Sequence, residues 1–73
     1  MNIKIIKELE VGPVRIILKR YDCNYFGKKF AYRIFVNALK TNNPLTFHGP
    51  YYSEGVAKGQ LTRISKDPRW KVS

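Results

Sequence analysis

Two segments of the chain alternate between aliphatic side chains and basic or aromatic ones with a period of two residues. They cover residues 14–21 and 29–36. Successive side chains of a β-strand point to opposite faces of its sheet, so this period predicts two strands that share an aliphatic face. The opposite face then gathers the basic and aromatic side chains of both strands, which are Arg15, Lys19, Tyr21, Lys29, Arg33 and Phe35.

Another strand is predicted ahead of these two. Most apolar side chains of residues 2–11 share one parity and most charged ones take the other, which is typical of a half-buried strand. Gly12 and Pro13 favour a tight reversal after it. A connection this short makes the two flanking strands antiparallel, because a parallel pair needs a long crossover.

Two loops are expected further along the chain. Residues 22–28 carry turn formers around two aromatic side chains, and they precede a strand over residues 29–37. After a loop at residues 41–44, residues 45–48 are either a fourth strand or an extension of the sheet edge, followed by a turn at Gly49-Pro50.

The hydrophobic period changes to that of a helix over residues 54–65. Ser53 is placed to cap its N-terminus, and Pro68 prevents the helix from continuing. Gly55 and Gly59 lie four residues apart on its flank, which predicts a close approach to the sheet or to a ligand.

These elements predict one α+β domain over residues 1–73, with an antiparallel sheet of three or four strands packed by one C-terminal helix. Residues 69–72 are expected to form an extended tail whose Trp70 packs at the edge of the core. The free sheet edges offer a seam for a homodimer. The predicted core consists of Ile3, Ile5, Ile16, Leu18, Tyr32, Ile34, Val36, Val56, Leu61 and Ile64.

The chain is strongly basic. Fourteen Lys and Arg residues against five Asp and Glu residues give a formal net charge of +9. Self-repulsion at this level disfavours the compact state unless a counter-charge is near, so a polyanion is the expected partner. The alternative is a small protein that is merely basic.

The sequence argues against a cofactor, a metal centre and catalysis. Cys23 is the only cysteine and His48 the only histidine, so neither a disulfide nor a cluster of metal ligands is expected. The carboxylates are scattered and no glycine-rich phosphate loop is present, so we expect no enzyme. Without a signal peptide or an apolar run of membrane length, the expected location is the cytoplasm, with no membrane contact.

The basic and aromatic face suits nucleic acid, because cations displace counterions from phosphates and rings stack on exposed bases. Duplex DNA is favoured over RNA. The alternative is an ordinary solvated face, which any small sheet covered by one helix must present. A second basic stripe lies on the helix, where a plain solvent face is again the alternative. The predicted nucleic-acid-binding residues are Arg15, Lys19, Tyr21, Lys28, Lys29, Arg33, Phe35, Lys58 and Arg63.

Over about residues 14–66, the order of three strands and a helix that begins with an aromatic residue, Ser53 and Glu54 resembles two families of DNA-binding domains. They are the domains of plant ethylene-response factors and the arm-binding domains of phage integrases. Their signature residues are not reproduced here. The resemblance implies that the face of Arg15, Lys19, Lys29 and Arg33 enters the major groove.

Residues 51–63, with the sequence YYSEGVAKGQLTR, are similar to a segment of small accessory proteins of tailed bacteriophages. Many such proteins bind nucleic acid or inhibit a host enzyme, so this resemblance implies a phage origin and the cytoplasm of a host. Two functions follow as expectations. The first is non-catalytic binding of nucleic acid, and the second is inhibition of a host protein through an acidic patch on that partner.

Overall fold

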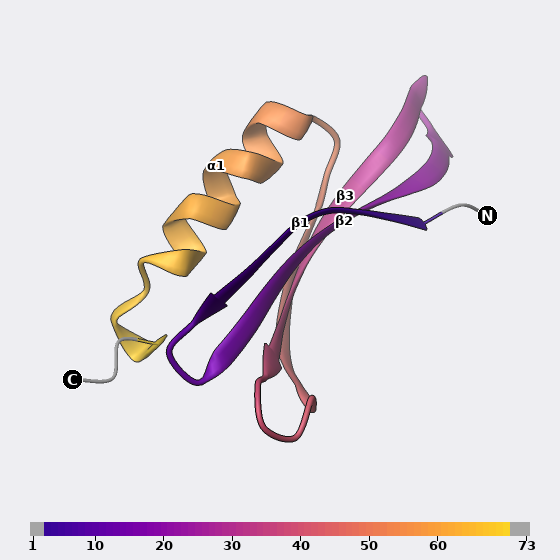
Figure 1. Cartoon of the computed structure of the whole chain (residues 1–73). Coiled ribbons are helices and arrows are strands. Elements are labelled where there is room, and N and C mark those ends of the chain that lie inside the picture. Colours follow the sequence, from indigo (N-terminus) through magenta and orange to yellow (C-terminus); the bar gives the residue numbers. More distant parts are fainter. Residues whose placement is uncertain (1–2, 71–73) are drawn as a thin grey trace.

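The computed structural model describes residues 3–70 and contains a four-stranded antiparallel sheet in the order β1-β2-β3-β4, with one α-helix across one face (Figure 1). The predicted α+β class is therefore confirmed, and residues 45–48 belong to a fourth strand. The elements are β1 (Ile3–Val11), β2 (Val14–Tyr25), β3 (Lys28–Ala38), β4 (Pro44–Tyr51), α1 (Glu54–Ser65) and a 3-10 turn (Pro68–Trp70). Within this part of the chain, β1 and β4 are the sheet edges, and the homodimer stays a prediction.

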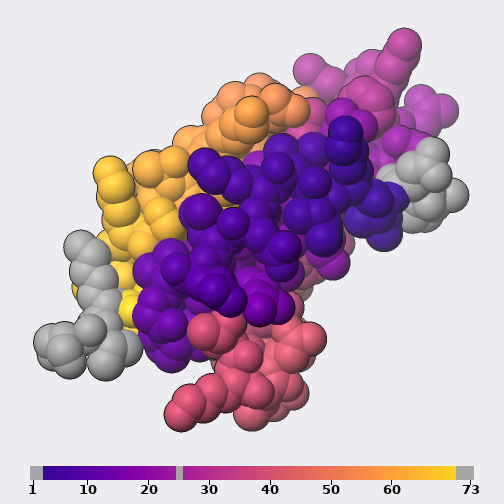
Figure 2. Space-filling view, in the orientation of Figure 1, coloured from indigo at the N-terminus to yellow at the C-terminus, as the bar shows by residue number. Residues whose placement is uncertain are grey.

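The two central strands are longer than the sequence pattern predicted. The segment 22–28 was expected to be a loop, but β2 runs to Tyr25 and β3 begins at Lys28. The chain reverses in two residues, Phe26 and Gly27, whose φ angles are 49° and 76°. Positive φ at both positions defines a type I′ turn, whose twist matches that of the strands, so pairing continues almost to the tip. In Figure 2 this end of the hairpin projects from the body of the molecule.

The predicted turn at Gly49-Pro50 instead lies inside β4, which continues to Tyr51. The pairing of β4 with β3 is irregular at this point, between the pairs Ile34↔His48 and Tyr32↔Tyr51. Gly49 and Pro50 stand opposite Arg33 alone, so the irregularity accommodates one extra residue and the strand continues past it.

The core lies between the sheet and α1. It joins alternate residues of β2 and β3 to two helix residues and the tail, and six of the predicted core residues are in it. Its buried members are Val14, Ile16, Leu18, Tyr32, Ile34, Val36, Ala57, Leu61 and Trp70, with Ile64 packed against them.

Two core predictions in β1 are wrong. Ile3 and Ile5 are 63% and 51% exposed, because the register of β1 against β2 shifts between Ile5 and Lys7. One extra residue in a strand reverses which face the following side chains take. Ile5 therefore lies opposite Lys19, away from the helix, while Ile6 packs against the core.

The predicted burial of Val56 is also wrong. Val56 is 52% exposed, and Ala57 is fully buried in its place. Ala57, Leu61 and Ile64 lie four and three residues apart, so they form one stripe toward the sheet. Val56 is turned about 100° away from Ala57 around the helix axis.

The helix glycines make no close approach to the sheet. A Cβ atom at Gly59 would meet nothing within 4 Å, and one at Gly55 would meet only Ser53 Oγ at 3.9 Å. The small residue at the helix–sheet contact is Ala57 instead. The expected close approach of these glycines to the sheet is therefore wrong, while their approach to a ligand stays a prediction. Ser53 is the N-cap residue as predicted, although its side chain forms no capping hydrogen bond.

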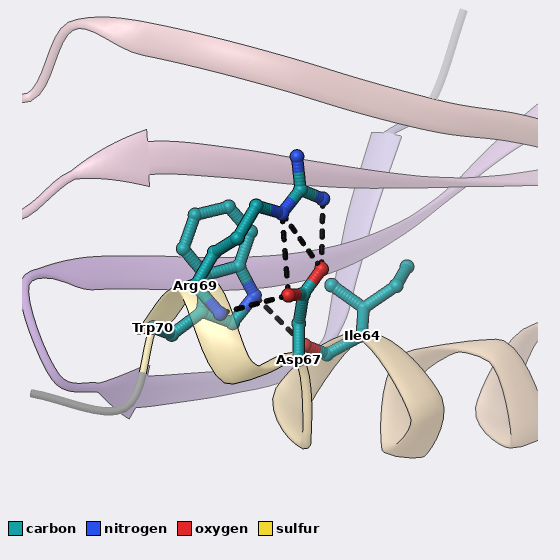
Figure 3. A network of polar contacts seen from close by, with 4 residues as sticks. All are labelled: Ile64, Asp67, Arg69 and Trp70. Atoms are coloured by element: carbon teal, nitrogen blue, oxygen red, sulfur yellow. Dashed lines mark hydrogen bonds and ion pairs between the residues drawn. The ribbon is translucent and has the colours of Figure 1, made fainter.

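The chain after α1 is a 3-10 turn where an extended tail was predicted, and only Lys71 and Val72 of that tail lie outside the described residues. Trp70 folds back onto the core, and its indole N–H donates to the Ile64 carbonyl at 2.8 Å (Figure 3). Asp67 fixes the turn: its Oδ1 accepts from the Arg69 backbone N–H at 2.9 Å, and its Oδ2 accepts from the guanidinium at 2.7 Å.

The hydrogen bonds from Arg69 lower the pKa of Asp67 below its usual 3.8. The stabilisation from this carboxylate is therefore complete above the unfolded-state pKa and is lost as the pH falls through the folded-state value. We expect Asp67→Asn to lower the free energy of unfolding by a constant amount between about pH 7 and pH 5, and by progressively less below about pH 4. Urea titrations of both proteins at several pH values measure this difference. A difference that stays constant down to pH 2 would contradict the role of the carboxylate charge.

Candidate nucleic-acid interface

The sheet face turned away from α1, here called the outer face, carries most of the predicted binding residues. Cross-strand partners share a face, so the pairing of β2 with β3 places Arg15 beside Asn37, Ile17 beside Phe35 and Lys19 beside Arg33. Phe47 of β4 lies opposite Phe35 and extends this face to the sheet edge. Residues from all four strands contribute to the outer face: Ile3, Ile5, Glu8, Glu10, Arg15, Ile17, Lys19, Tyr21, Arg33, Phe35, Asn37 and Phe47.

Lys19 and Arg33 form the cationic centre of the outer face. The Lys19 Nζ lies 5.0 Å from the centroid of the Phe35 ring. The Arg33 guanidinium carbon lies 5.3 Å from the centroid of the Tyr21 ring and 5.9 Å from that of the Phe47 ring. These contacts hold both cations over aromatic rings, which restricts their side chains without neutralising them.

Neither Lys19 nor Arg33 forms an ion pair with any carboxylate of residues 3–70. The Arg33 Nε is shielded from solvent and has no hydrogen-bond partner in the same part of the chain. A buried N–H without an acceptor is unfavourable. Because this Nε is shielded, an incoming anion would have to be bound by the other nitrogens of the Arg33 guanidinium.

Apolar side chains fill the middle of the outer face. Ile17 is only 8% exposed although it faces away from the core, while Phe47 is 59% exposed. The rings of Phe35 and Phe47 lie with their centroids 6.4 Å apart and their planes 31° apart. Sequence analysis missed Phe47 because the parity of β4 was not assigned. Its alternation with Thr46 and His48 is the signal that places it.

Arg15 is on the outer face as predicted, but β1 neutralises it. Its guanidinium lies 3.1 Å from Glu10 Oε1 and 3.9 Å from Glu8 Oε1. The two glutamates belong to the outer face themselves, since they lie opposite Arg15 and Ile17. The β1 side of the face is therefore locally acidic, and the cationic part lies over Lys19 and Arg33.

The remaining predicted residues lie away from the pair Lys19 and Arg33. Lys28 and Lys29 are exposed at the start of β3, beside the projecting turn. Lys58 and Arg63 are on α1, which covers the other side of the sheet, and Lys58 is paired with Glu54 at 3.2 Å. The structure thus brings together Arg15, Lys19, Tyr21, Arg33 and Phe35, and it separates them from the two helix residues.

Other kinds of site find little support in residues 3–70. No three His, Cys, Asp or Glu side chains of this part of the chain lie together in a way that could hold a metal ion. His48 is opposite Ile34 in β4, and its Nε2 is shielded and without a hydrogen-bond partner there. Cys23 is in the projecting hairpin, where its Sγ donates weakly to the Lys28 carbonyl at 3.5 Å. None of the described helices is long and apolar enough to cross a membrane.

Two cations without carboxylate partners among residues 3–70 lie over three aromatic rings on an uncovered sheet face. Comparisons of the chain with models of protein families, with curated proteins and with solved structures found no match.

Proposed function

We propose that the protein binds nucleic acid through the outer face, without catalysis. The observation that carries this proposal is the pair Lys19 and Arg33, which are neighbours across β2 and β3 and have no carboxylate partner among residues 3–70. The net charge of +9 adds a long-range attraction for any polyanion. Lys19 and Arg33 would contact phosphates, and Tyr21, Phe35 and Phe47 would make the apolar contacts.

The width of the sheet suggests how duplex DNA, the expected ligand, would be held. Four strands spaced by about 4.8 Å place β1 and β4 roughly 14 Å apart, whereas the major groove is only about 12 Å wide. The whole face therefore suits contact across the phosphate backbones at the rim of a groove. This differs from the docking that the family resemblance implies, in which a three-stranded sheet face enters the groove.

One observation favours a second candidate function, docking on an acidic protein. Ile17, Phe35 and Phe47 form a continuous apolar centre with cations beside it. Aromatic anchors surrounded by charged residues are also typical of protein interfaces. The partner would then be a host protein with an acidic patch, inhibited by a phage-type accessory protein.

A salt titration tests the proposal. We expect Lys19→Ala/Arg33→Ala to weaken binding to a labelled 20-base-pair duplex and to make the negative slope of log K against log salt shallower by about 2, because two phosphate contacts are lost. Fluorescence anisotropy over a series of salt concentrations measures both quantities. Parallel titrations with single-stranded DNA and duplex RNA measure the expected preference for duplex DNA.

The matched control is Lys58→Ala/Arg63→Ala, which removes the same charge from α1. This variant should change affinity only weakly and leave the slope within about half a unit of the wild type. If the helix variant makes the slope shallower and the sheet variant does not, the interface lies on α1 and the outer face is excluded. If the wild type does not bind near physiological salt, nucleic-acid binding is excluded, and docking on an acidic protein becomes the leading function.

A further inference from the structure

The end of the β2–β3 hairpin is a two-stranded ribbon that stands apart from the rest of the sheet (Figures 1 and 2). Among the described residues, the last pair of β1 with β2 is Ile3↔Tyr21, and the last pair of β4 with β3 is Tyr51↔Tyr32. Beyond those pairs, residues 22–30 pair with no other segment of residues 3–70 than each other, and we call them the ribbon. A two-stranded ribbon is narrow enough for a groove of duplex DNA, unlike the full outer face.

Phe26, at the tip of the ribbon, has a backbone conformation that is unusual for a phenylalanine. Its φ angle is 49°, a region that bulky side chains disfavour and that asparagine or glycine adopts readily. In a type I′ turn ahead of Gly27, asparagine is the preferred residue. Phe26 is also 90% exposed, so burial does not compensate for the unfavourable backbone. Backbone conformations of this kind cluster at binding sites, so an exposed aromatic ring on such a backbone at the tip of a hairpin indicates a ligand.

The charges around Phe26 indicate the kind of ligand. Lys28 and Lys29 are exposed directly after the turn. Arg20, close to the base of the ribbon, lies with its guanidinium carbon 4.4 Å from the centroid of the Phe30 ring. Asp22 is the only acidic residue of the ribbon, so the cations outnumber it. An apolar ring followed by two lysines at a narrow tip is complementary to base pairs flanked by phosphates.

We infer that the ribbon enters a groove of duplex DNA and that Phe26 inserts its ring between adjacent base pairs as a wedge, kinking the duplex. Wedges of this chemistry unstack a base step and bend the axis by tens of degrees. Lys28 and Lys29 would then contact the phosphates on either side of the opened step. This inference rests on the proposed function, because the outer face would hold the flanking backbone while the ribbon enters the groove.

The experiment compares wild type, Phe26→Asn and Phe26→Trp on a 30-base-pair duplex. One set of duplexes carries dyes at both ends, so that energy transfer reports bending, and another carries 2-aminopurine, whose fluorescence rises on unstacking. We expect wild type and Phe26→Trp to raise both signals. Phe26→Asn should raise neither and should bind roughly tenfold more weakly. Its fold is preserved because asparagine suits the turn, and a melting temperature at or above that of wild type confirms this.

The failures of the two proposals are distinguishable. If the wild type binds the duplex but changes neither signal, or if Phe26→Asn changes both as the wild type does, the wedge is overturned and binding by the outer face stands. If the wild type binds no duplex, both proposals fail. A membrane is the other partner that an exposed ring beside lysines can suit. If Phe26→Asn loses only binding to phosphatidylserine vesicles, a membrane replaces DNA as the ligand of the ribbon.

Discussion

Replacing Trp70 by alanine is expected to lower the free energy of unfolding by about 3–5 kcal/mol, the usual range for removing a large buried aromatic side chain. Trp70 is 8% exposed and closes the end of the core where α1 stops. Its indole N–H also donates a second hydrogen bond to the Ile64 carbonyl, which accepts from the Asp67 backbone N–H at the helix end as well. Native domains have only about 5–15 kcal/mol in total, so this loss is a large fraction of the stability and the variant should unfold at a clearly lower urea concentration than the wild type.

Urea unfolding followed by far-ultraviolet circular dichroism measures this loss. The control is Trp70→Phe, which keeps much of the apolar volume but removes the N–H donor. Its free energy of unfolding should therefore lie between those of the wild type and Trp70→Ala. If Trp70→Ala loses less than about 1 kcal/mol, the tail does not contribute to the core as the structure indicates.

Gly49→Ala is expected to lower the free energy of unfolding by at least about 2 kcal/mol, because strain and overpacking act together. The φ angle of Gly49 is 119°, which L side chains rarely adopt. A Cβ atom there would lie 2.9 Å from the Tyr32 carbonyl oxygen and 3.4 Å from Arg33 Cα. Both neighbours belong to the backbone of β3, so neither can move without disturbing the strand.

The matched control is Gly59→Ala, which places the same methyl group in the interior of α1 with nothing within 4 Å. It should raise the free energy of unfolding by about 0.5–1 kcal/mol, since alanine favours the helix. Thermal unfolding of both variants beside the wild type gives the two changes. Equal changes in the free energy of unfolding at the two positions would show that the close approach of Gly49 to β3 does not determine the effect of the added methyl group.

The alternating pattern of residues 14–21 and 29–36 predicted most of the candidate interface. Alternation sets the face of each side chain once the strands pair without a shift, and β2 pairs with β3 regularly from Val14 to Asp22. The sequence therefore placed Lys19 and Arg33 on one face with Tyr21 and Phe35. It also predicted the bounds of α1, because Ser53 and Glu54 mark one end and the apolar spacing marks the other.

The wrong core predictions concern residues whose face depends on an extra residue in a strand or on the rotation of the helix about its axis. The extra residue at Ile6 places Ile3 and Ile5 on the face away from the helix, and no local sequence pattern predicts such a bulge. The helix faces the sheet with Ala57 rather than Val56, because a small side chain permits a closer contact than a β-branched one. The pairing of Arg15 with Glu10 could not be predicted from alternation, since it depends on how β1 is aligned with β2.

The glutamates of β1 make the charge of the outer face asymmetric. Glu8 and Glu10 lie at one side of the sheet, and Lys19, Arg33 and the ring of Phe47 lie over the middle and the opposite side. A polyanion that approaches this face would be repelled by the two glutamates and attracted by Lys19 and Arg33. The region that it can contact is therefore limited to β2, β3 and β4. If the outer face binds nucleic acid as we propose, Glu8 and Glu10 would orient the ligand, and reversing their charge should enlarge the area that the ligand contacts rather than strengthen each contact.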